Sequence, residues 1–472
     1  MPDELCSLTI TEAAGLVERR EVSPVDLTRS AFDRIERYDA QLAAFISRYQ
    51  ETAMLSAKEA EREISHGNYR GRLHGIPIAL KDNIYLRGEV TTMGSKIHQN
   101  FTPDYDAGVV ERLRAGGAVI LGKTNMHEYA LGVTTDNPHY GTCRNPWDLS
   151  RSPGGSSGGS AVAVASQLAY GALGTDTSGS IRIPAAACGL VGLKPTYGRI
   201  GKHGIFPEAW TLDHVGTLTR CVADAAIMLD AISGHDQRDP TSLDLAPTRL
   251  GESLSPDIRG MIIGIEEDYF FADVDSDVAR IVRSAIDTLQ QLGAVIRPIT
   301  LSTLRHCVWA LSIIDSSETT TVHEATLRER PEDYGNDVRF LLECGTLPSA
   351  VDYLQAQQLR AKIKHEFAAV FTEVDVIAAP TVPIRTPMIG ELVTTANGTE
   401  VDTIESLMRL VGPANLVGLP SVSLPCGLLD GMPVGIELMA RPLNEQQLLI
   451  VAATLESTDT LRGHAPTAYS QT

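Results

Sequence analysis

The sequence predicts an α/β protein organised around one large β-sheet. Short apolar segments of strand length alternate with amphipathic helical segments between residues 76 and 121. Further strand segments occur far along the chain, at 374–379 and 421–439, so both halves contribute strands. The composition, 43% hydrophobic and 21% charged residues, is that of a globular protein with enough apolar side chains for a large core.

The N-terminal part, residues 1–67, is predicted to be helical. Thr11 is a candidate cap for one helix, and Ser23-Pro24-Val25-Asp26 has the residues expected at the start of a second. A third helix is expected from about Glu51 to Gly67. These segments are charged and amphipathic, so we expect them to pack outside the main core.

Strand and helix signals alternate in the next part of the chain. The predicted elements are, in order, a strand at 76–80, a helix at 108–115, a strand at 118–121, a helix at 160–170 and a strand at 171–175. Lys81 directly follows the first strand, and a loop containing Ser180 follows the last. Functional side chains at the carboxyl ends of strands are typical of open α/β sheets.

The C-terminal half contains a second set of elements. They are, in order, a strand at 261–265, a helix at 278–292, strands at 295–299, 374–379, 421–424 and 434–439, and a helix at 445–456. Asp430-Gly431 stands between two strand segments and predicts a tight hairpin, because this turn needs residues that accept positive φ.

Two stretches rich in glycine and serine indicate chemistry. Ser152 to Ser160 reads SPGGSSGGS, and Gly174 to Pro184 reads GTDTSGSIRIP. Glycine lets backbone N–H groups approach a ligand closely. A serine in such a loop is a candidate nucleophile beside an oxyanion hole. Lys81, in the segment Gly75 to Asn83, completes the set of candidates.

These residues resemble the amidase signature family of serine hydrolases. Lys81, Ser156 and Ser180 match the family's lysine, its serine after a cis peptide bond (here Gly155–Ser156) and its nucleophilic serine, at similar separations. One departure is Ser178, which stands where the family usually has glycine.

The resemblance implies a single amidase domain over residues 1–472, with a large mixed β-sheet flanked by helices on both faces. Within it, residues 1–67 would form the N-terminal helices and 70–200 the signature core. Residues 200–370 would be a variable region that supplies pocket walls, and 371–460 the C-terminal part of the core.

The resemblance also implies roles for the three residues: Ser180 as nucleophile, Lys81 as base and Ser156 as proton relay. A free lysine has a pKa of about 10.4. Burial beside apolar residues of its strand would lower the pKa of Lys81. Asp82 would oppose this shift, but neighbours on a strand face opposite sides, so we expect Asp82 to point away.

Other loop residues have predicted supporting roles. The oxyanion hole is predicted to use backbone N–H groups of Thr177, Ser178, Gly179 and Ser180. We expect Ser157, Asp176 and Arg182 to brace the loop through hydrogen bonds rather than to react. Five aromatic residues line an apolar pocket or fill the core, and the sequence does not decide between these roles: Trp210, Tyr269, Phe270, Phe271 and Trp309.

Charge and composition exclude several classes of function. The formal net charge of −19 disfavours direct contact with nucleic acids or anionic membranes. No secretory signal and no transmembrane segment is evident. The seven cysteines are scattered and the 12 histidines lack metal-ligand spacing, so we expect reduced thiols, no metal and no other cofactor. We expect a cytoplasmic homo-oligomer, specifically a dimer.

The leading hypothesis is a stand-alone amidohydrolase that cleaves a small amide, or a carbamate or urea-like C–N bond, through an acyl-enzyme. The alternative is the glutaminase A subunit of a tRNA-dependent amidotransferase, which would use the same triad. The segments 322–328, 337–339 and 352–354 look more like those of stand-alone amidases, and this region lacks the Lys-Arg-Arg-rich helix associated with the amidotransferase subunit.

Two other interpretations are weaker. A catalytically silent binding relative would not need all three triad residues. Residues 154–158 also match the G-x-S-x-G nucleophile elbow, but that motif must follow a buried strand, and the preceding residues 144–148 do not form one.

Overall fold

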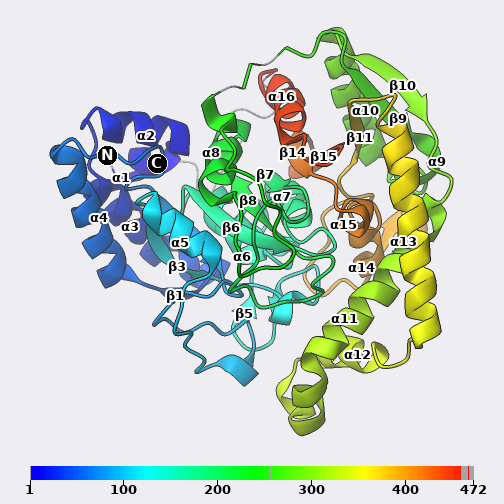
Figure 1. The fold of residues 1–472 in the computed structure, drawn as a ribbon, viewed down its shortest axis with the longest axis horizontal. Helices are drawn as coiled ribbons and strands as arrows, with labels where there is room; N and C mark the ends of the chain where they lie inside the picture. The colour runs from blue at the N-terminus through cyan, green and yellow to red at the C-terminus, as the bar shows by residue number, and fades with distance from the viewer. Residues whose placement is uncertain (1, 253, 256, 459–465, 467–472) are drawn as a thin grey trace.

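A computed structural model describes residues 2–252, 254–255, 257–458 and 466. Its main feature is one 11-stranded sheet that takes strands from both halves of the chain (Figure 1). The strand order is β1 (Phe45–Arg48), β3 (Val119–Thr124), β2 (Pro77–Lys81), β6 (Gly171–Asp176), β8 (His214–Thr219), β7 (Val191–Lys194), β14 (Ser421–Leu429), β15 (Met432–Ala440), β11 (Val376–Pro380), β9 (Ile262–Glu266) and β10 (Val295–Ile299).

The sheet is mixed, as predicted. Strand β2 pairs in parallel with both β3 and β6, whereas β6 pairs antiparallel with β8. Strands β14 and β15 form the predicted hairpin, with Asp430 and Gly431 at φ of 52° and 79°. Two separate ribbons pair β4 (Asp136–Asn137) with β5 (Gly141–Thr142) and β12 (Val393–Ala396) with β13 (Thr399–Asp402).

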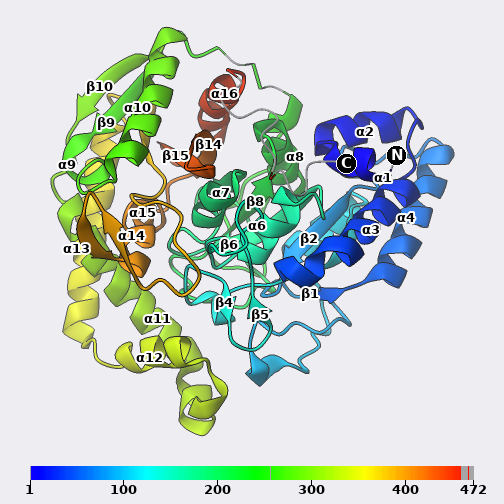
Figure 2. The same cartoon turned by 180° about the vertical axis from the view of Figure 1, so that it is seen from behind.

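Helices cover both faces of the sheet. On one face lie α2 (Ile10–Glu18), α5 (Gly108–Ala115), α8 (Val222–Ile232), α10 (Ser276–Gln291) and α16 (Glu445–Glu456). On the other face, seen in Figure 2, lie α3 (Pro24–Leu42), α6 (Gly158–Ala165) and α7 (Arg182–Cys188). Alternate residues of β2 point to opposite faces of the sheet. Ile78 and Leu80 belong to the hydrophobic core on the first face, and Ala79 belongs to the core on the second.

Three helices form an outer layer along one side of the molecule (Figure 1). The chain runs out along α11 (Cys307–Glu329), turns through α12 (Asn336–Cys344) and returns along α13 (Ala350–Val370). The other helices are α1 (Pro2–Ser7), α4 (Gln50–Ser65), α9 (Glu267–Phe270), α14 (Thr403–Arg409) and α15 (Gly412–Val417). In the part of the chain that the structure describes, no helix is both long and apolar enough to cross a membrane.

Some predicted elements need correction. The N-terminal part is not wholly helical, because β1 lies within it and forms the edge strand of the sheet, paired with β3. The cap of α2 is Thr9 rather than Thr11: its hydroxyl accepts from the N–H of Glu12 at 3.1 Å. Ser23 caps α3 as predicted, accepting from the N–H of Val25 at 3.0 Å.

A buried carboxylate joins the N-terminal helices to the sheet layer. Asp224, on α8, accepts hydrogen bonds from the N–H groups of Ile10 and Thr11 at 2.8 and 2.9 Å. The substitution Asp224→Ala removes the partner of both donors and leaves the Ile10 N–H buried without one. We predict that it lowers the free energy of unfolding by about 2–3 kcal/mol, measured by chemical denaturation.

The matched control is Asp26→Ala, which removes an exposed carboxylate paired with Arg29. It should change the free energy of unfolding by less than about 0.5 kcal/mol. Equal effects of the two substitutions would show that Asp224 does not hold α2 in place.

Candidate active site

Lys81 and Ser156 lie in direct contact at the buried carboxyl end of β2. Neither side chain is exposed. Lys81 Nζ lies 2.7 Å from Ser156 Oγ and 2.8 Å from Oγ1 of Thr175, the residue before the last of β6. The peptide bond Gly155–Ser156 is cis. The fold therefore brings together two candidates that are far apart in the sequence.

The surroundings of Lys81 favour its neutral form. Burial lowers the pKa of Lys81 from 10.5 to about 7, although the carboxylates of Glu208, Asp176 and Asp213 act in the opposite direction. Asp82 points away from it, as expected, and approaches Lys123, with 3.6 Å between Oδ1 and Nζ. Without a carboxylate in hydrogen-bonding contact among the described residues, a large fraction of Lys81 is uncharged near neutral pH.

Ser180 lies in the loop after β6 and lines a cavity of about 490 Å³. Its carbonyl oxygen accepts from the N–H of Ser157 at 3.2 Å, which ties the two serine loops together. Among the described residues, no hydrogen bond joins Ser180 Oγ to Ser156 or Lys81. The hydrogen bond between Lys81 and Ser156 is thus present, whereas among the described residues none joins Ser156 to Ser180 Oγ. Catalytic contacts of this kind often shorten when substrate binds.

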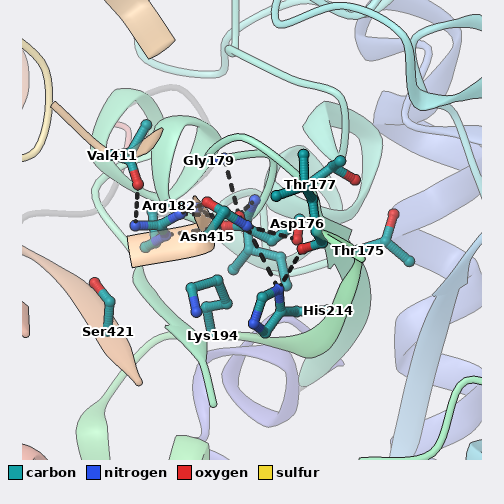
Figure 3. Close-up of polar contacts among 12 residues, drawn as sticks. Thr175, Asp176, Thr177, Gly179, Arg182, Lys194, His214, Val411, Asn415 and Ser421 are labelled. Atoms are coloured by element: carbon teal, nitrogen blue, oxygen red, sulfur yellow. Dashed lines mark hydrogen bonds and ion pairs between the residues drawn. The ribbon is translucent and has the colours of Figure 1, made fainter. Parts of the chain in front are cut away.

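A buried ion-pair network fixes the Ser180 loop (Figure 3). Arg182 Nε and Nη2 lie 3.0 and 2.9 Å from the two carboxylate oxygens of Asp176. Arg182 also pairs with Glu437, and Asn415 Nδ2 donates to Asp176 at 2.8 Å. Burial alone would raise the pKa of Asp176, but Arg182 outweighs it and holds that pKa well below its usual value. These contacts match the bracing role expected for Asp176 and Arg182.

Gly179 occupies a position that suits only glycine. Its φ is +107°, and a Cβ atom there would lie 2.3 Å from Cγ2 of Val411. Its N–H donates to Asp176 Oδ1 at 2.9 Å. The prediction for Gly179 as an oxyanion donor is therefore revised, because that N–H is already engaged. The N–H groups of Thr177, Ser178 and Ser180 remain the candidates.

The cavity beside Ser180 is lined mainly by three segments of the chain. Residues 130–133 form one wall; 312–320, on α11, and 341–348, which run from the end of α12 into the loop after it, form others. The last two lie in the region predicted to supply pocket walls. The five aromatic candidates are not among its lining residues. Tyr269 and Phe270 belong to the hydrophobic core instead.

Several residues of the site are not among those predicted from the sequence. Thr175 contacts Lys81, and Asn83 Nδ2 donates to Thr175 Oγ1 at 3.0 Å. Asn83 lies in the same short motif as Lys81, so the sequence alone could have indicated it. Glu208 and Asp315 line the cavity. No local pattern marks them, because the tertiary fold alone brings them to Ser180. Ser157, as expected, is a bracing donor: its Oγ lies 3.0 Å from the carbonyl oxygen of Thr175.

Comparisons with known proteins find relatives that match nearly the whole chain. The glutamyl-tRNA(Gln) amidotransferase A subunit of Moorella thermoacetica is 38% identical, with 96% of this chain and 97% of the relative covered. A solved complex described in connection with the origins of an s-triazine catabolic enzyme has a TM-score of 0.93 at 34% identity, covering 96% of this chain and 99% of that one. A bacterial aryl acylamidase of the amidase signature family has a TM-score of 0.88 at 27% identity, covering 98% and 97%.

The family model named Amidase matches residues 26–449, which is most of the chain. The sheet, the cis Gly155–Ser156 bond and the buried lysine at the end of β2 lie within that match. The chain is a member of the amidase signature family.

Proposed function

We propose that this protein hydrolyses the C–N bond of an amide, with Ser180 as nucleophile. The observation that supports it most is the 2.7 Å contact between Ser156 Oγ and a lysine whose pKa is lowered to about 7. A hydroxyl nucleophile needs a base that is unprotonated near neutral pH. Lys81 meets this requirement because burial lowers its pKa.

In the proposed first step, Ser180 Oγ attacks the carbonyl carbon. Its proton passes to Ser156, whose own proton passes to Lys81. Backbone N–H groups of the loop stabilise the oxyanion; one such donor is worth about 3–4 kcal/mol of barrier. The proton then returns by the same route to the leaving nitrogen, the C–N bond breaks, and an acyl-enzyme forms on Ser180. Water releases the acid by the same sequence of proton transfers.

Two functions would use this chemistry: that of a glutaminase subunit of an amidotransferase and that of a stand-alone amidohydrolase. The amidotransferase relatives favour a glutaminase subunit, because they match over nearly their whole length at 38% identity. A stand-alone amidohydrolase acting on a small amide, carbamate or urea-like bond is favoured by the cavity. Among its described lining residues there is no lysine, arginine or histidine to receive the α-carboxylate of glutamine. We further propose a cytoplasmic location and, for the stand-alone enzyme, a homodimer.

Removing the proposed nucleophile should abolish turnover. We expect Ser180→Ala to lower kcat by about 10⁴-fold or more, and Lys81→Ala and Ser156→Ala each by about 10²–10⁴-fold. The assay is release of ammonia or amine from a panel of amides and carbamates. Ser65→Ala and Lys58→Ala, both exposed on α4, are matched controls and should retain full activity. Full turnover by Ser180→Ala would contradict the proposal.

The pH dependence should report Lys81. Its neutral form is the base, and this form is populated as the pH rises through about 7. The logarithm of kcat/KM should therefore rise with pH on the acidic side and level off above about pH 7, with a fall of about tenfold per unit below it. A profile that stays flat from pH 5 to 9 would rule out Lys81 as the base.

An assay of the purified protein distinguishes the stand-alone amidohydrolase from the glutaminase subunit. If the enzyme stands alone, it should turn over small amides as a homodimer without added partners, with glutamine a poor substrate. Size-exclusion chromatography with light scattering gives the mass, and ammonia release gives the rate. Glutamine hydrolysis that appears only in the presence of the other amidotransferase subunits would establish the glutaminase interpretation instead.

A further inference from the structure

Two carboxyl groups face the cavity close to the proposed nucleophile. Glu208 and Asp315 line it together with Ser178 and Ser180. Glu208 is 6% exposed, and its Oε2 is buried without a hydrogen-bond partner among the described residues. A buried carboxylate oxygen without a partner costs free energy unless a donor reaches it. Glu208 therefore contributes to the cavity wall a carboxyl group with one buried oxygen that no donor of the described residues meets.

No basic side chain among the described lining residues balances these carboxyl groups. Burial raises the pKa of Glu208 well above its ordinary value and that of Asp315 to about 7, and the nearby Asp213 adds to both shifts. Lys81 acts in the opposite direction on Glu208, but the proposed mechanism needs it uncharged. A cation supplied from outside would pair with both carboxylates and offset the cost of ionising them in the cavity.

The rest of the wall restricts what that cation is. The apolar lining includes Leu131, Val133, Ile313, Leu342, Ile404 and Met408. Such a surface suits an alkyl or aryl body rather than a hydrated ion. Within the described residues, no group of His, Cys, Asp or Glu is arranged to hold a metal ion. An organic ammonium group attached to an apolar body fits this cavity: the ammonium group would lie beside the two carboxyl groups and the body against the apolar wall.

Building on the proposed function, we propose that the substrate is an amide that also bears a protonated amine, whose N–H groups donate to Glu208 and Asp315 while the amide carbonyl meets Ser180. These two residues then determine specificity. A substrate carboxylate in the same place would face two carboxyl groups without a counter-charge, which disfavours anionic amides. The amine lies on an alkyl or aryl body that occupies the apolar wall.

The test needs no knowledge of the substrate. An uncharged alkyl fluorophosphonate labels a reactive Ser180: the P–O bond forms, fluoride leaves, and the serine proton passes to Lys81 through Ser156. The labelling rate is measured by mass spectrometry in the presence of hexylammonium, hexanol or hexanoate as competitors of similar size. We expect hexylammonium to halve the rate at a concentration about tenfold or more below that of either other competitor.

Variants assign the effect to the two carboxyl groups. In Glu208→Gln and in Asp315→Asn, the advantage of hexylammonium over hexanol should fall by about tenfold, because the charge is removed and the shape is kept. The exposed Glu59→Gln is the matched control and should keep the wild-type ratio. The ratio is taken within each protein, so a general loss of reactivity does not imitate the expected result.

The outcomes separate this inference from the function on which it rests. Equal protection by all three competitors in the wild-type protein, or stronger protection by hexanoate, overturns the inference while labelling of Ser180 still supports the hydrolase. An unchanged ratio in both variants also overturns it. Failure of the fluorophosphonate to label Ser180 in the folded protein overturns the proposed function and the inference with it.

Discussion

The burial of Lys81 is the constraint on which the site depends. Water is excluded on all sides of its ammonium group, and desolvation is the largest influence on its pKa. The fold achieves this by ending β2 between two parallel neighbours, β3 and β6, in the interior of the sheet. The loop that contains Ser156 then closes over the lysine.

A low pKa alone does not mark a catalytic lysine, as two other buried lysines show. Burial lowers the pKa of Lys123 to about 8 and that of Lys194 to about 7. Lys123 is paired with Asp82, and Lys194 donates to backbone carbonyl groups, including that of Pro195 at 3.3 Å. Lys81 differs in its partners, because the hydroxyls of both Ser156 and Thr175 contact its Nζ. Its contacts, more than its pKa, suit it to move a proton.

Much of this arrangement could be predicted from the sequence. The strand before Lys81, the hairpin at Asp430-Gly431 and the mixed sheet follow from local patterns and from the motif resemblance. Strands β7 and β8 are not among the elements predicted from the sequence. The pairing of β1 with β3 joins segments far apart in the chain, and periodicity within one segment carries no information about such a partner.

The site shows the same division. Lys81 and Ser156 can be identified because their neighbours are unusual in composition, whereas Glu208 and Asp315 come from ordinary segments that only the fold brings together. The central claim is that a large fraction of Lys81 is uncharged near neutral pH. NMR titration of the Lys81 Cε signal, with labelled lysine and with Lys81→Met to assign it, tests this directly. The account predicts a pKa near 7; a value near that of a free lysine, about 10.4, would contradict it.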